Sequence, residues 1–163
     1  MKFIISNSVL AAGLMLLSAA SYGETTITSV PYTITAQGRY ILGNDLLYSA
    51  ANGNAITVKT NNVTIDLNGH ILHNLTSNNG ATGIFASNGA NVHVRNGAIA
   101  GFYVGVHFSG FGHLVDGIRF SAITPNAVWF EVSKACVVQK LSDYRSWPCW
   151  RGIYKRNRKS CGQ

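Results

Sequence analysis

The sequence predicts an all-β solenoid of about four turns, in which short parallel strands stack on one another. A four-residue phrase, with a small residue first and apolar residues second and fourth, recurs at steps of 28, 22 and 22 residues. A second strand-like phrase runs between its copies at steps of 29, 21 and 23 residues. No helical stretch separates the two. Repeats of about 20 to 30 residues made of strands and turns stack to bury one continuous core.

The inward positions of the repeated strands hold mainly Val, Ile and Phe. Copies of the first phrase are Ala55–Val58, Gly83–Ala86, Gly105–Phe108 and Ala127–Phe130, and the second phrase is centred on Ile65, Val94, Val115 and Val138. A leucine-rich repeat would place leucines at fixed offsets with an asparagine ladder, whereas the inward residues here are mainly Val, Ile and Phe. We therefore expect two short strands per turn, in fixed order.

Asparagine and glycine mark the expected corners between these strands. Both residues tolerate the left-handed backbone conformation that tight turns require. Six such sites occur between Tyr32 and Leu141: Asn61-Asn62, Asn68-Gly69, Asn78-Asn79-Gly80, Asn88-Gly89, Asn96-Gly97 and Asp116-Gly117.

One stretch of the repeat carries a resemblance to a known family. Val63–Ile71 resembles the first full rung of the right-handed parallel β-helix proteins of the pectate-lyase-like superfamily, and most closely its secreted, NosD-like bacterial branch. Gly38–Leu42 with Asn44–Leu46 resembles the N-terminal capping strand of that family, and the likeness covers about residues 32–141. It implies a right-handed parallel β-helix. Because the superfamily holds lyases, hydrolases, epimerases, adhesins and proteins without known catalysis, it leaves the activity open.

The N-terminal residues read as a cleaved secretory signal. Lys2 precedes an apolar run at Val9–Ala20, and Ser21-Tyr22-Gly23 offers small residues at the positions that signal peptidase recognises. A membrane anchor is the alternative, but a span needs about 20 apolar residues and residues 6–8 are polar. We expect a secreted or periplasmic protein without integral membrane association.

Four segments follow from these patterns. They are a signal peptide at 1–23, an N-terminal cap at 24–50, the β-helix rungs at 51–142 and an atypical tail at 143–163.

The charge distribution argues against nucleic acid as a partner. The formal net charge of the chain is +7. Residues 24–142 hold six basic and five acidic groups, whereas residues 143–163 hold six basic groups and one acidic group. A phosphate-binding surface should instead lie on a folded face with aromatic partners.

The tail has two explanations. It contains Cys149 and Cys161, together with Trp147 and Trp150, and lacks the Val/Ile alternation of the rungs. A disulfide between Cys149 and Cys161 would make it a C-terminal cap suited to an oxidising compartment. The abrupt loss of the period instead favours a frameshift that truncates a longer β-helix, and truncation is the interpretation that we prefer.

An outward row on the first strand is the candidate binding site. Side chains alternate between the two faces of a strand, so Thr57, Phe85, His107 and Trp129 should point outward on neighbouring turns. Aromatic rings in such a row suit the apolar faces of sugars and predict binding of a polysaccharide or cell-surface glycan. One alternative is that aromatic and β-branched residues simply favour strands, and that a loop or a lost downstream segment covers the row. Another is that the row is a surface for a partner protein.

An outward row on the second strand is the candidate catalytic site. Asp66, Arg95 and Asp116 should stack there with alternating charge. Such exposed ladders are usually structural and stabilise little, about 0.2 to 1 kcal/mol per pair. A polysaccharide lyase would use the carboxylates to hold calcium and the arginine to abstract or stabilise a proton. Calcium takes about six to eight oxygen ligands, however, and two aspartates supply too few.

Other chemistry is less well supported by the sequence. The Asn-Thr-Asp, paired Asp and Gly-His-Gly segments of polygalacturonases do not occur. The five histidines fall on different strands and turns, so we expect no metal site, and calcium only if the protein is a lyase. We expect an exported, non-catalytic, carbohydrate-facing module. A polysaccharide lyase or hydrolase is the alternative, and a copper-accessory role, implied by the NosD-like resemblance, is the third.

Overall fold

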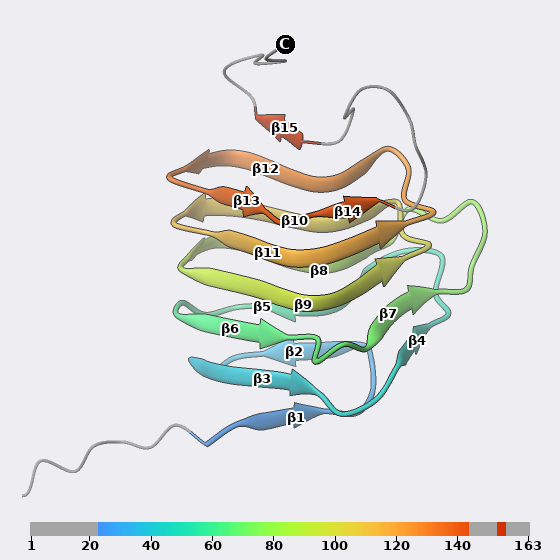
Figure 1. Ribbon diagram of the computed structural model, residues 1–163, viewed down its shortest axis with the longest axis horizontal. Coiled ribbons are helices and arrows are strands. Elements are labelled where there is room, and N and C mark those ends of the chain that lie inside the picture. The colour runs from blue at the N-terminus through green and yellow to red at the C-terminus, as the bar shows by residue number, and fades with distance from the viewer. Residues whose placement is uncertain (1–22, 144–152, 156–163) are drawn as a thin grey trace, which may run out of the picture.

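Successive turns of the chain stack in parallel to form a β-helix of about five turns in the computed structural model (Figure 1). The structure describes residues 23–143 and 153–155, which contain strands and turns and no helix. This confirms the predicted right-handed parallel β-helix class. Within these residues, no helix is long and apolar enough to span a membrane. The predicted signal peptide and the Cys149–Cys161 pair lie outside the described residues, except for Gly23.

One face of the solenoid is a six-stranded parallel sheet, here called sheet B. It contains every copy of the first phrase. Its strands run in the order β15-β12-β10-β8-β5-β2. Their bounds are β2 Tyr32–Ile34, β5 Asn54–Val58, β8 Thr82–Ala90, β10 Val104–Phe111, β12 Asn126–Lys134 and β15 Ile153–Lys155.

The remaining strands form a nine-stranded parallel sheet, sheet A, whose main order is β1-β3-β6-β9-β11-β13. Strands β4, β7 and β14 join it beside this path. Their bounds are β1 Thr25–Ile27, β3 Gly38–Leu42, β4 Leu46–Tyr48, β6 Val63–Asp66, β7 Ile71–Asn74, β9 Val92–Ala100, β11 Leu114–Ser121, β13 Val137–Gln139 and β14 Ser142–Asp143.

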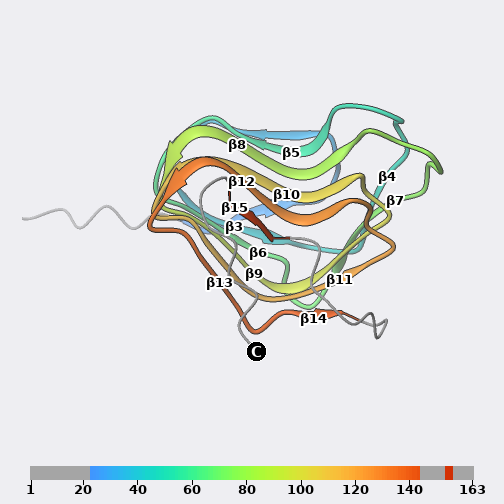
Figure 2. The ribbon, with the colours of Figure 1, turned by 90° about the horizontal axis from the view of Figure 1, so that it is seen from above.

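Sheet A bends in the middle, so the cross-section has three sides instead of two (Figure 2). The first half of β9 pairs with β6, and its second half pairs with β7. The bend falls where Asn96, Gly117 and Lys140 have positive φ angles of 58°, 63° and 49°. The expectation of two strands per turn was therefore incomplete, because the Asn-Gly corner bends a strand that continues beyond it.

The predicted inward positions form the core. The second residue of each phrase is completely buried: Ile56, Ile84, Val106 and Val128. The fourth residues are at most 3% exposed: Val58, Ala86, Phe108 and Phe130. Alternation along one strand and stacking between turns thus place eight apolar side chains in a continuous interior, which confirms the inward reading of the phrase.

The small first residue of the phrase has a steric cause. A Cβ atom at Gly83 would lie 2.6 Å from the carbonyl oxygen of Gly105 and 3.1 Å from the side chain of Ile99. At Gly105, a Cβ atom would lie 2.7 Å from the ring of Phe120. Even the methyl group of alanine would therefore displace the neighbouring turn at these two positions, which accounts for glycine there.

All six predicted corners contain a residue in the left-handed region. These are Asn62, Asn68, Asn78, Asn88, Asn96 and Gly117. The structure adds corners that the Asn and Gly pattern did not indicate, including Val132 and Ala135, with φ of 45° and 51°. Val132 is the extra residue of a bulge where β12 pairs with β10.

Both end segments contribute strands to the sheets. Residues 24–50 supply β1 to β4, of which β2, β3 and β4 pair with the next turn as β5, β6 and β7. In the tail, β15 pairs with β12 and puts Tyr154 in register with Trp129. The sequence pattern did not predict this strand, because the tail lacks the alternation of the rungs.

Candidate functional site

The aromatic row lies on sheet B in register over successive turns. Thr57 pairs with Phe85, Phe85 with His107, and His107 with Trp129. All four side chains are partly exposed. Parallel strands lie about 4.8 Å apart, so the row follows the axis of the solenoid and brings together residues that are 22 or 28 positions apart in the sequence.

The rings of the row contact one another in two different ways. The imidazole of His107 lies parallel to the indole of Trp129, with ring centroids 4.6 Å apart and an interplanar angle of 6°. Phe85 meets the same imidazole at 74°, with centroids 5.2 Å apart. One face of the Trp129 ring is therefore occupied by His107, whereas the Phe85 ring is turned out of that stack.

Glu131 adds a carboxylate to this row. It lies two residues after Trp129 on β12, and its Oε2 is 3.2 Å from Nε2 of His107. Because a carboxylate only accepts hydrogen bonds, Nε2 carries the hydrogen and donates it. The Glu131 side chain is 48% exposed, against 16% for His107. Glu131 was not among the predicted site residues, although strand alternation from Trp129 places it on the same outer face.

The charged row on sheet A is also in register. Asp66 pairs with Arg95, and Arg95 pairs with Asp116. Asp66, however, is only 4% exposed. The prediction of an exposed ladder was therefore wrong for this residue, because side chains from adjacent turns cover its carboxylate.

The carboxylate of Asp66 is fully engaged by its neighbours. Its Oδ2 accepts from Arg39 at 3.1 Å and from Arg95 at 2.8 and 3.0 Å. Its Oδ1 accepts from the backbone N–H of Asn68 at 2.9 Å and from the Asn96 side chain at 3.1 Å. Burial alone raises the pKa of Asp66, but the hydrogen bonds from Asn68, Asn96 and Arg95 outweigh it and lower the pKa below its usual value.

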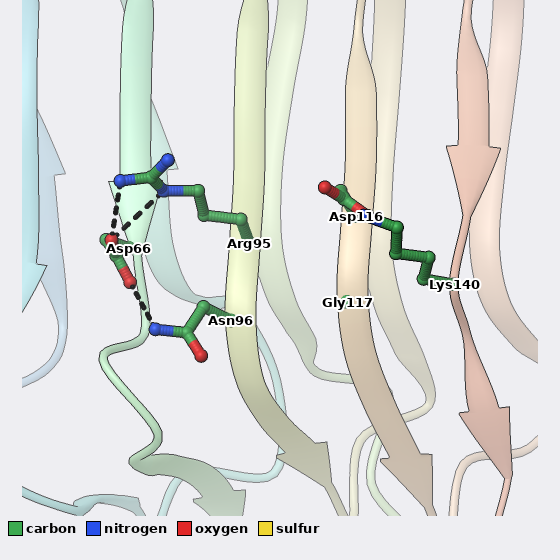
Figure 3. Close-up of a pocket in the computed structure, with 6 residues that line it drawn as sticks. All are labelled: Asp66, Arg95, Asn96, Asp116, Gly117 and Lys140. Carbon is green, nitrogen blue, oxygen red and sulfur yellow. Dashed lines mark hydrogen bonds and ion pairs between the residues drawn. The ribbon is translucent and has the colours of Figure 1, made fainter.

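Asp116 is held more loosely than Asp66. Its Oδ1 is buried without a hydrogen-bond partner, and Nζ of Lys140 lies 3.9 Å from it. The two carboxylates border an open polar depression of about 350 Å³ (Figure 3). In Figure 3 the Arg95 guanidinium is directed to Asp66, while Asp116 and Lys140 lie on the following strands. The residues that line the depression are Asp66, Arg95, Asn96, Asp116, Gly117 and Lys140.

This depression offers little for acid–base or calcium chemistry. A general base needs a carboxylate that is free to accept a proton from the substrate. Asp66 has no such freedom, since both of its oxygens accept hydrogen bonds from the protein. Asp116 alone supplies far fewer than the about six to eight oxygen ligands that calcium takes.

The histidines are separated by the fold. His107 lies on sheet B, and His93 lies on the outer side of sheet A with its Nε2 buried and unpartnered. His113 is completely buried; its Nδ1 accepts the Val92 N–H at 3.3 Å, and its Nε2 donates to the Ser109 carbonyl at 3.2 Å. His70 pairs with Asp45 at 3.1 Å. No cluster of three potential metal ligands occurs in the ranges that the structure describes.

Burial lowers the pKa of His113 below that of a free imidazole, although its hydrogen bond to Ser109 acts in the opposite direction. The ring is therefore neutral at neutral pH and serves as a structural link between two backbone groups of the corner.

Comparisons with protein-family models, with curated proteins and with solved structures returned no match for this chain. The parallel β-solenoid is thus established by its own strand register, and any function has to be argued from the surface residues.

Proposed function

We propose that this protein is an exported, non-catalytic module that binds polysaccharide along the outer face of sheet B. The observation that carries the proposal is the in-register row of partly exposed rings, Phe85, His107 and Trp129, next to the carboxylate of Glu131. Aromatic surface combined with a few polar groups suits sugars, which have apolar ring faces and hydroxyl edges.

The three rings differ in how much of their surface is left for a sugar. His107 and Trp129 stack on each other, so part of their ring surface is used within the protein. Phe85 is inclined at 74° to His107 and stands outside the parallel stack. We expect Phe85 to make the largest contact with a sugar, with His107 and Trp129 fixing the local shape of the face.

Membership of the pectate-lyase-like superfamily, and of its NosD-like branch, is part of the same proposal. It is supported by the resemblance of Val63–Ile71 to a rung of that family and by the parallel β-helix in which this stretch forms β6 and the start of β7. Export rests on the N-terminal sequence pattern alone.

The binding test uses the exported full-length chain and affinity electrophoresis against a panel of neutral and acidic polysaccharides. Phe85→Ala should lower the affinity for a bound polysaccharide about tenfold or more, because truncating an aromatic hot spot costs about 2 kcal/mol or more and about 1.4 kcal/mol corresponds to tenfold. The matched control is Tyr103→Ala. Tyr103 is an aromatic residue 45% exposed at the corner before β10, off the row.

Two results would refute the proposal. One is the absence of binding to every polysaccharide in the panel, and the other is an equal loss of affinity in the Phe85→Ala and Tyr103→Ala variants. Circular dichroism of each variant shows whether the β-helix is retained.

A polysaccharide lyase is the second candidate, and the polar depression around Asp66, Arg95 and Asp116 is the observation that favours it. Release of unsaturated products from polygalacturonate in the presence of calcium would support this candidate, provided that Asp116→Asn abolishes it. The full engagement of the Asp66 carboxylate makes catalysis the weaker of the two proposals.

A further inference from the structure

We infer that the ligand of sheet B is a neutral, hydroxyl-rich polysaccharide and that Glu131 selects it over polyuronates. The inference rests on the carbohydrate-binding function proposed above and specifies the substrate class. It follows from the hydrogen-bonding groups beside the aromatic row and from the charges on the same face.

The carboxylate beside the row is an acceptor. The His107 Nε2–H is donated to Glu131, so this nitrogen is not free to bond a ligand. The Glu131 carboxylate is itself acceptor-only and about half exposed. A ligand at this point must supply donors, and sugar hydroxyl groups do so.

Charge leads to the same class of ligand. The side chains that the structure describes on the strands of sheet B include one carboxylate, Glu131, and one cation, Lys134, which lies three residues further along β12. Strand β15, which pairs with β12, also contains Lys155. Lys59 follows the end of β5. No arginine lies on the described strands of this sheet to form a bidentate pair with a uronate carboxylate. A polyuronate would bring acceptors and negative charge towards Glu131, where repulsion opposes binding.

The arginines of sheet A are not available to bind a uronate carboxylate on sheet B. The two arginines best suited to a carboxylate ligand, Arg39 and Arg95, lie on the other sheet and are paired with Asp66. Their guanidinium groups therefore already hold an internal counter-ion, and they serve a different face of the solenoid.

The test compares three probes at one fixed ionic strength: hydroxyethyl cellulose and galactomannan, which are neutral, and polygalacturonate. The wild-type protein should bind at least one neutral polymer more tightly than polygalacturonate. Glu131→Gln should lower the affinity for that polymer about tenfold, because a hydrogen bond to a charged acceptor is replaced by one to a neutral acceptor. Glu131→Lys should also weaken neutral binding and should increase the affinity for polygalacturonate.

Asp45→Asn is the matched control. Asp45 is also an exposed carboxylate hydrogen-bonded to a histidine, His70 at 3.1 Å, but it lies between β3 and β4 on the sheet A side. Its removal changes the net charge as Glu131→Gln does and should leave the affinity for all three probes unchanged.

The outcomes separate this inference from the function on which it rests. If polygalacturonate binds as tightly as the neutral polymers, and Phe85→Ala weakens it, the carbohydrate face is real and the inferred selectivity is wrong. Equal effects of Glu131→Gln and Asp45→Asn would also overturn the role of Glu131. If no probe binds the wild-type protein, the proposed function fails together with the inference.

Discussion

His107 and Trp129 lie on adjacent strands of sheet B with their rings stacked at 4.6 Å and 6°. The contact joins consecutive turns of the solenoid on its outer surface. Its contribution to the free energy of unfolding can be measured without a ligand.

We expect the two rings to stabilise each other by about 0.5 to 1.5 kcal/mol, the usual coupling of an aromatic pair. A double-mutant cycle of His107→Ala and Trp129→Ala in urea unfolding measures this free energy. Thr57 and Trp129, which are separated by two intervening strands, form the control pair and should show coupling close to zero. Additive effects of the His107 and Trp129 substitutions would show that the stack adds nothing to stability.

Asp66→Asn should be among the most destabilising polar substitutions in the β-helix. It leaves Arg95 without its carboxylate partner and leaves Arg39 paired with Glu24 alone. We expect a loss of about 2 kcal/mol in the free energy of unfolding, which is less than for a fully buried pair because the Arg39 and Arg95 side chains are 46% and 37% exposed. Asp116→Asn should cost less than about 1 kcal/mol, since Asp116 has only a 3.9 Å contact with Lys140. Comparable losses in the two variants would contradict this account.

The low pKa of Asp66 predicts a dependence of stability on acid. Because the folded-state pKa is lower than that of an unfolded aspartate, about 3.9, the folded state holds fewer protons. The stabilisation is present above that value and is lost as the pH falls through the folded-state pKa. Urea unfolding between pH 5 and pH 2 should show a steep loss in the wild type and a shallower one in Asp66→Asn.

Buried His113 predicts a second effect at milder pH. Its pKa is lower in the folded state than the unfolded value of about 6.5. As the pH falls, His113 therefore binds a proton at a higher pH in the unfolded chain than in the folded protein. The free energy of unfolding should decrease as the pH drops below about 6.5. His113→Gln, which retains one donor and one acceptor, should flatten the slope of unfolding free energy between pH 7 and pH 5. An unchanged slope would assign the effect to another group, such as His93, whose pKa is also lowered by burial.

Val132→Asn should stabilise the protein. Val132 is a β-branched residue at φ 45°, 79% exposed, in the bulge of β12. On β8 the corresponding residue of the bulge is Asn88, at φ 53°. A left-handed conformation costs a residue other than Gly or Asn about 1 to 2 kcal/mol, so thermal unfolding should shift upward. The same change at exposed Val137, which lies in regular strand β13, should bring no gain.

The fold was predictable from the sequence to a large extent, because its signal is local and repeated. Ile56, Ile84, Val106 and Val128 could be identified as core residues from the alternation and the 22-residue step, and all four are buried. The third side of the solenoid could not be read in the same way. Its strands continue through the bend at Asn96 and Gly117. The Asn and Gly pattern predicted a turn there and gave no indication that β9 continues and pairs with β7.

The candidate site was predictable only as rows of residues. Alternation placed Phe85, His107 and Trp129 on one face, but it gave no ring orientation. It placed Asp66 on the outer side of sheet A and could not show that Arg39, 27 residues earlier, covers it. Contacts of this kind depend on side-chain conformation across turns, which a strand pattern does not encode.

By itself, the sequence determined the solenoid, its inward residues and the membership of each outward row, because strand alternation and a constant repeat length are properties of the chain. Only the tertiary structure decided that Asp66 is enclosed by two arginines and that the Glu131 carboxylate hydrogen-bonds to His107. Both outcomes depend on which side chains from neighbouring turns come within hydrogen-bonding distance, and that is fixed when the turns stack.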